Sequence, residues 1–204
     1  MIQFITKAIL SLLLLILPVT CFAHNAIGYK PERTMKNLQE IEKYFYDNYA
    51  LKLKNDVTVY VTKSHKEYRD ILIRCNVQNA KHIAETSYAV TSKTNTILID
   101  GSMLSDKHFY FILAHEMVHR YQFENLPDPH ADYVLLEGHA DVIAEKISNY
   151  DINITDHRIA HESLKTRKQF FQACKNNPEE ILEQIRYYAS KTPFLPKEEN
   201  KETI

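Results

Sequence analysis

The sequence of residues 111–147 is FILAHEMVHRYQFENLPDPHADYVLLEGHADVIAEKI, in which two charged clusters interrupt an otherwise apolar, helix-like pattern. The first cluster runs from His115 to His119, and the second runs from Glu137 to Asp141. In a helix, side chains four positions apart lie on one face, with roughly 5–6 Å between their Cβ atoms. The two histidines can therefore present their imidazoles to one ion, and the spacing predicts a metal site on a helix.

A third ligand is expected from the second cluster, because a catalytic zinc site usually has three protein ligands and one position for water. Glu137 lies 18 residues after His119 and fits this role if the chain turns back as an antiparallel helix. Residues 125–129, NLPDP, supply the turn, since proline cannot continue a helix. This one stretch thus contains two imidazoles, a carboxylate and the turn that brings them together.

Two further carboxylates have roles that follow from the same geometry. Glu116 is next to the first histidine and is not needed as a ligand, so it can reach the water position as a general base. Asp141 is one turn beyond Glu137 and faces the same way. A metal-binding imidazole needs an acceptor for its second N–H group, and we expect Asp141 to be that acceptor.

The two clusters together resemble the gluzincin branch of the zinc metallopeptidases, in which a His-Glu-x-x-His helix is followed by a Glu-x-x-x-Asp helix. Within that branch the chain is most similar to the compact peptidase-MA-like domains, whose second helix carries an apolar-apolar-x-Glu-Gly-x-Ala pattern. In this chain residues 134–140 read VLLEGHA. The resemblance implies an α+β, zincin-like fold with a short mixed N-terminal β-sheet, an active-site helix, a glutamate helix and C-terminal helices.

The resemblance also implies roles for individual residues. One Zn2+ per chain would be bound by His115, His119 and Glu137, with Glu116 as the catalytic base and Asp141 orienting a histidine. The alternative without a metal is a pair of surface histidines on an amphipathic helix.

One residue departs from the family pattern. Arg120, directly after the second histidine, stands where these enzymes usually carry an uncharged residue, a departure that concerns the outer rim of the site. His139, inside the second cluster, is expected to point away from the metal, because its neighbours Glu137 and Asp141 occupy the metal-facing direction.

Related enzymes add a His or Tyr donor that helps to stabilise the oxyanion of the tetrahedral intermediate. The candidates for this donor are His157, His161, Tyr187 and Tyr188. His157 and His161 are four positions apart on an expected helix and could line the cleft. The alternative for each candidate is an ordinary surface side chain.

The chain has 204 residues, of which 45% are hydrophobic and 25% charged, and its net charge is −1. This composition is typical of one globular domain. No basic stripe stands out, which argues against nucleic acid as a main partner. The expected partner is a peptide or protein substrate, and the oligomeric state stays open.

Residues 1–23 have the pattern of a secretory signal peptide. Lys7 precedes the apolar run of residues 8–17, and Cys21-Phe22-Ala23 is a plausible cleavage site. We expect cleavage after Ala23, a secreted or periplasmic protein and no stable membrane span after cleavage. The alternatives are an uncleaved anchor or lipidation at Cys21. The metallopeptidase domain would then span residues 24–191, followed by a flexible tail at residues 192–204.

Hydrophobic periodicity predicts the remaining elements. Residues 76–85 stay open as a helix or a loop. In gluzincins an edge strand just before the metal-binding helix pairs with the extended substrate backbone, so one strand of the expected hairpin would be that edge. The alternative is a plain hairpin that covers the core. The expected helices are 33–53, Ser64 (as N-cap) to Cys75, Ser105 (as N-cap) onward, 130–149, 156–175 and 178–191, and the expected strands are 56–62, 86–90 and 96–100.

The sequence supports a secreted zinc metallopeptidase that hydrolyses oligopeptides or exposed loops. The alternative is a non-catalytic zinc-containing binding or chaperone-like module of the cell envelope. Glu116 discriminates between the two, because a purely structural site needs no carboxylate there. A third interpretation is a latent enzyme, whose activity is blocked by the N-terminal segment or the tail.

Cys75 and Cys174 are the only thiols left after signal cleavage. They could form a disulfide or remain free thiols.

Overall fold

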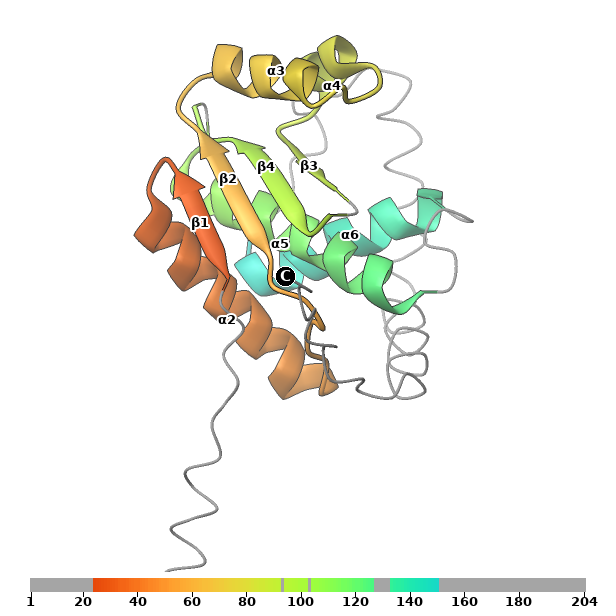
Figure 1. The fold of residues 1–204 in the computed structure, drawn as a ribbon. Helices are drawn as coiled ribbons and strands as arrows, with labels where there is room; N and C mark the ends of the chain where they lie inside the picture. Colours follow the sequence, from red (N-terminus) through yellow and green to blue (C-terminus); the bar gives the residue numbers. More distant parts are fainter. Residues whose placement is uncertain (1–23, 93, 103, 127–132, 151–204) are drawn as a thin grey trace, which may run out of the picture.

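The computed structural model describes residues 24–150 apart from residues 93, 103 and 127–132 (Figure 1). The described part is an α+β fold with a small mixed sheet, as the sequence predicts. Its elements in chain order are β1 (Asn25–Gly28), α2 (Pro31–Tyr49), β2 (Thr58–Thr62), α3 (His65–Arg74), α4 (Ala80–Thr86), β3 (Ala89–Thr91), β4 (Thr96–Asp100), α5 (Asp106–Asn125) and α6 (Tyr133–Ser148).

The four strands form one sheet with the order β1-β2-β4-β3. β1, β2 and β4 run parallel, with Val59 of β2 opposite Ile97 of β4. β3 pairs antiparallel to β4, with Val90 opposite Leu98. The predicted hairpin is therefore confirmed, and β3 is an edge strand of the described sheet.

The sheet separates two hydrophobic clusters because successive side chains of a strand point to opposite faces. Val59, Ile97 and Ile99 pack into the larger cluster with α2, α5 and α6. Leu98 lies on the other face and packs with Tyr68 and other residues of α3 and α4. Figure 1 shows the resulting arrangement, with α3 and α4 over one face of the sheet and α5 and α6 side by side over the other.

The helix expected at residues 33–53 ends earlier, at Tyr49. Ala50 adopts a left-handed conformation with φ 54°, and the Leu51 N–H donates to the Phe45 carbonyl at 3.3 Å, which closes the helix. Leu51 and Leu53 are buried although they lie beyond the helix. Their apolar side chains continue the helical periodicity of the sequence, which is why the predicted helix is too long at its C-terminal end.

The strand expected at residues 86–90 was wrong in its first three positions, since β3 begins at Ala89. Residues 80–86 form α4, so the open segment 76–85 is helical in its second half. Thr86 has the β-branched side chain typical of strands. Here its hydroxyl donates to the His82 carbonyl at 2.8 Å, one turn back in the helix.

Both predicted serine N-caps are present. The Ser64 hydroxyl accepts from the Glu67 N–H at 3.2 Å, and the Glu67 carboxylate accepts from the Lys63 N–H at 2.9 Å. The Ser105 hydroxyl accepts from the His108 N–H at 3.3 Å, so α5 begins at Asp106. The Ser64 cap begins α3 and the Ser105 cap begins α5, each where the sequence predicts it.

α5 lies in the middle of the described fold, where it packs against α2, β3 and α6. The Tyr121 ring stacks on Phe45 of α2, with 4.0 Å between the ring centroids.

Of the helices in the described ranges, none combines the length and the apolar character needed to span a bilayer. Cys75 is exposed. The predicted signal peptide, the helices at 156–175 and 178–191, the tail and Cys174 lie outside the described residues.

Candidate metal centre

α5 and α6 bring three side chains to one point. The Nε2 atoms of His115 and His119 lie 3.0 Å apart. The Glu137 carboxylate approaches both of them, with Oε2 3.4 Å from His115 Nε2 and Oε1 3.2 Å from His119 Nε2. One ligand atom from each residue lies within 4.8 Å of the others, a group that could hold a metal ion.

The pairing of the two helices explains this convergence. His115 contacts Asp141, His119 contacts Glu137, and Gln122 contacts the carbonyl of Leu136. Residue numbers rise along α5 while those of its partners fall along α6, so the helices are antiparallel. Histidines one turn apart on α5 therefore meet Glu137 and Asp141, which are one turn apart on α6.

Oxygen atoms on the far side of each ring indicate which nitrogen carries the proton. Nδ1 of His115 lies 2.9 Å from Oδ1 of Asp141, and Nδ1 of His119 lies 2.8 Å from Oε1 of Gln122. Each oxygen is an acceptor, so in the neutral rings each Nδ1 is the donor and each Nε2 carries a lone pair. Two lone pairs and a carboxylate then face one another, an arrangement that a bound cation or added protons must satisfy.

The charges in this group make it strongly attractive to a cation. Burial alone would lower the pKa of His115, but the carboxylates of Asp141 and Glu137 outweigh burial and raise the pKa to about 10. The Glu137 carboxylate also raises the pKa of His119 against the opposing effect of burial. Burial would raise the pKa of Glu137, yet the two imidazoles hold it well below its usual range. Two nitrogen donors and one oxygen donor around a point that favours positive charge fit a divalent metal ion.

No protein-family model matches the chain, and no curated protein or solved structure matches it either. We therefore infer the chemistry of the centre from its side chains.

Glu116 lies beside the ligand group without belonging to it. Its side chain points toward β3, where the Thr91 hydroxyl donates to the carboxylate oxygen Oε2. The same hydroxyl lies 3.4 Å from the Glu116 backbone carbonyl. The carboxylate is thus held in place by a strand distant in sequence, and it remains separate from the three ligand atoms.

Gln122 connects the centre to a second buried histidine. Its Nε2 donates to the Leu136 carbonyl at 3.1 Å and to Nδ1 of His139 at 2.9 Å, while its Oε1 faces His119. His139 accordingly lies outside the ligand group. Burial, with His119 and Lys146 adding to it, lowers the pKa of His139 to about 3, so this ring stays neutral.

Arg120, the residue that departs from the family pattern, contacts the β3–β4 turn and Glu124. Its side chain is buried at 2% exposure and points toward the β3–β4 turn. Its guanidinium lies 3.2 Å from the carboxylate of Glu124, one turn further along α5. Consecutive residues of a helix point about 100° apart, so the residue after His119 faces a different neighbour.

Two residues that contact the candidate site were missed by the sequence analysis. Gln122 is three positions after His119 on the same helix, so helical spacing could have identified it. Thr91 is 25 residues away from Glu116, and no local pattern predicts their contact. The proposed oxyanion donors His157, His161, Tyr187 and Tyr188 lie outside the described residues.

Proposed function

We propose that this protein is a secreted or periplasmic zinc metallopeptidase of the gluzincin type, which hydrolyses peptide bonds. The observation that carries this proposal is the convergence of His115, His119 and Glu137 on one point, with Asp141 on the far side of one ring. Two imidazoles and one carboxylate are a common ligand set of catalytic zinc, and three protein ligands leave a position for water.

Each side chain has a part in this proposal. Zinc, when bound by His115, His119 and Glu137, would supply a water of lowered pKa and a Lewis acid for the scissile carbonyl. Glu116 would accept the proton of the attacking water and pass it to the leaving amine. Thr91 holds Oε2 of Glu116 and so fixes the orientation of this base. Asp141 keeps the His115 ring turned with Nε2 toward the metal.

The position of β3 supports a peptide substrate. β3 is an edge strand, it packs against α5, and its last residue, Thr91, contacts Glu116. An edge strand can pair with an extended peptide through backbone hydrogen bonds that do not depend on the peptide sequence. A substrate backbone laid along β3 would therefore bring its scissile bond near the base.

One observation favours the alternative, a non-catalytic zinc-containing binding or chaperone-like module. His115, Glu116 and His119 are all buried, with exposures of 6–8%, whereas catalysis requires a peptide to reach the metal. Glu137, with 22% of its side chain exposed, marks the most accessible side of the ligand group. Activity measurements separate the two functions, because both would retain the metal.

Metal removal tests the proposal directly. We expect the mature protein to contain zinc in a one-to-one ratio and to cleave members of a peptide library. A chelator should abolish cleavage, and added zinc should restore it. Elemental analysis and mass spectrometry of the digest provide the two measurements. Bound zinc without cleavage would favour the non-catalytic module, and a protein that binds no zinc would contradict both functions.

Zinc affinity is expected to increase with pH. In the metal-free protein the pKa of His115 is about 10, against an ordinary value of 6.5. Protonation of His115 therefore stabilises the metal-free fold below pH 6.5, and this contribution is lost as the pH rises toward 10. Zinc must displace the same proton, so its affinity should rise about tenfold per pH unit for each proton displaced.

Competitive zinc titrations at several pH values across this window measure the slope. Asp141→Asn is the comparison variant, because removing this carboxylate lowers the pKa of His115 and should flatten the slope at the alkaline end. Equal affinities across the window in the wild type would show that zinc does not displace this proton.

A further inference from the structure

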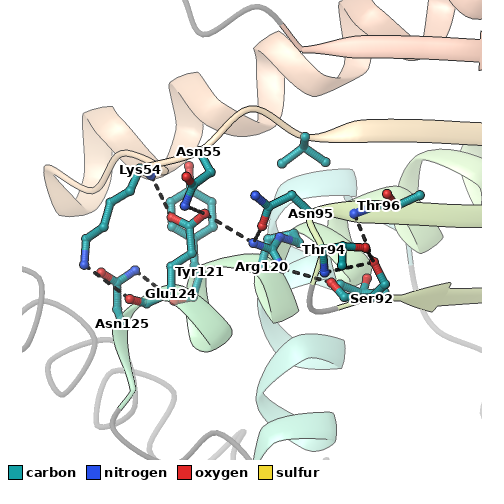
Figure 2. A network of polar contacts seen from close by, with 12 residues as sticks. Lys54, Asn55, Ser92, Thr94, Asn95, Thr96, Arg120, Tyr121, Glu124 and Asn125 are labelled. Carbon is teal, nitrogen blue, oxygen red and sulfur yellow. Dashed lines mark hydrogen bonds and ion pairs between the residues drawn. The ribbon is translucent and has the colours of Figure 1, made fainter. Parts of the chain in front are cut away.

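Arg120 and Glu116 lie one turn apart on the face of α5 that contacts the β3–β4 hairpin. Glu116 accepts from Thr91, the last residue of β3, and Arg120 donates from Nη1 to the carbonyl of Ser92, the next residue, at 3.1 Å. The second guanidinium nitrogen donates to the side-chain oxygen of Asn95 in the same turn (Figure 2). The base and Arg120 therefore contact consecutive residues of the edge hairpin.

The guanidinium is paired with a carboxylate that reaches a third segment. Glu124 Oε1 accepts from Arg120 at 3.2 Å and from the side-chain amide of Asn55 at 3.2 Å. Glu124 Oε2 accepts from the Lys54 N–H at 2.6 Å, and the Lys54 ammonium donates to the Glu124 carbonyl at 3.2 Å. Figure 2 shows these contacts between α5, the loop before β2 and the β3–β4 turn. The ion pair thus joins three segments at one point.

Asn95 is the residue of the turn whose side chain accepts from Arg120. It adopts a left-handed conformation with φ 61°, and its backbone carbonyl accepts from the Thr58 N–H of β2 at 2.9 Å. Its side chain accepts from Arg120 on the other side. The turn is therefore fixed both to the neighbouring parallel strand and to α5.

Stability alone does not explain a charged pair at this position. Arg120 and Glu124 have side-chain exposures of 2% and 5%, and apolar residues often replace a buried ion pair without loss of stability. A guanidinium differs from an apolar side chain in its planar, directional donors, which define the position of each acceptor. Here those acceptors are Ser92 and Asn95, on either side of the hairpin turn.

We propose that Arg120, paired with Glu124, is a positioning residue that holds the β3–β4 hairpin against α5 and keeps the edge strand aligned with the base Glu116. The consequence for peptide binding rests on the proposed function, because it requires the substrate to pair with β3. The alignment itself is a property of the fold and can be measured without any substrate.

Two variants of the full-length protein test this alignment. Arg120→Met keeps the apolar stem and removes the donors. Asn95→Gly removes one acceptor while tolerating the left-handed backbone. For both, we expect amide hydrogen exchange in residues 89–99 to accelerate at least about tenfold, while exchange in β1 and the zinc content stay unchanged. Should Arg120→Met not fold, Asn95→Gly alone decides the result.

Peptide hydrolysis provides the second measurement. With the edge strand misaligned, we expect KM to rise at least about fivefold and to change more than kcat, which falls only as far as the contact between Thr91 and Glu116 loosens. Leu38→Ala is the matched control, because it creates a cavity in the core at α2 and removes none of the polar contacts that hold the hairpin turn. It should lower thermal stability while leaving KM and the relative exchange of the hairpin unchanged.

The outcomes separate this proposal from the proposed function. Exchange in the hairpin that is unchanged, or that accelerates only as much as in the rest of the sheet, would overturn the positioning role of Arg120. A KM equal to the wild-type value despite selective acceleration would overturn its consequence for substrate binding. If hydrogen exchange accelerates selectively in the hairpin but the protein cleaves no peptide, the positioning role of Arg120 is supported and the peptidase function is contradicted.

Discussion

Glu116→Gln is expected to lower peptide hydrolysis by about 10²–10⁴-fold while the zinc content stays unchanged, since it removes a general base and no ligand. The glutamine oxygen can still accept from the Thr91 hydroxyl, so the side chain should keep its position. Steady-state kinetics and elemental analysis of the same preparation measure the two effects. The expected loss lies in kcat, because proton transfer belongs to the reaction step.

Glu40→Gln is the matched control, since it makes the same chemical change on the exposed face of α2. It should leave both hydrolysis and zinc content at wild-type values. If Glu116→Gln lost zinc and activity in parallel, Glu116 would be a ligand. If the variant hydrolysed peptides normally, another group would have to be the base.

Glu137→Ala is expected to have the largest effect on metal binding. It removes the only carboxylate among the three ligands. The loss of a residue that merely hydrogen-bonds to a ligand typically lowers metal affinity roughly 10–100-fold, and here the zinc affinity should fall by more than that. The pKa of both histidines should also fall, because Glu137 raises them in the wild type. Competitive titration with a chromophoric chelator measures the affinity.

Glu145→Ala on the same helix, two turns beyond Glu137, is the control for removing a carboxylate from α6. Its zinc affinity should equal that of the wild type. Glu137→Asp adds a stricter comparison, because it keeps the charge and shortens the reach of the ligand. Unchanged zinc occupancy in Glu137→Ala would assign the third ligand to another residue.

The sequence by itself determined which side chains share a face of α5 and which share a face of α6. His115 and His119 share a face because a helix repeats every 3.6 residues, and the same rule places Asp141 behind Glu137. The serine caps were predictable for a similar reason, since a cap depends on residues only a few positions away. The three ligands could therefore be predicted once the chain was assumed to turn back so that the two helices are antiparallel.

The ends of elements were less predictable from sequence. Leu51 and Leu53 continue the apolar pattern of α2, yet they are buried from a non-helical segment. Thr86 favours a strand by its side chain, but it ends a helix. The apolar pattern indicates that Leu51 and Leu53 are buried, and the side chain of Thr86 indicates a preference for strands. In both cases packing against other elements decides the backbone conformation.

Only the tertiary structure decided what lies on the other faces of α5. The sheet order makes β3 an edge and brings Thr91 to Glu116, and the β3–β4 turn receives the side chain of Arg120. These contacts join residues 25–28 positions apart, whose meeting depends on strand register and helix packing. Helical spacing fixes directions within one element, whereas the neighbour found in each direction is set by how the elements pack.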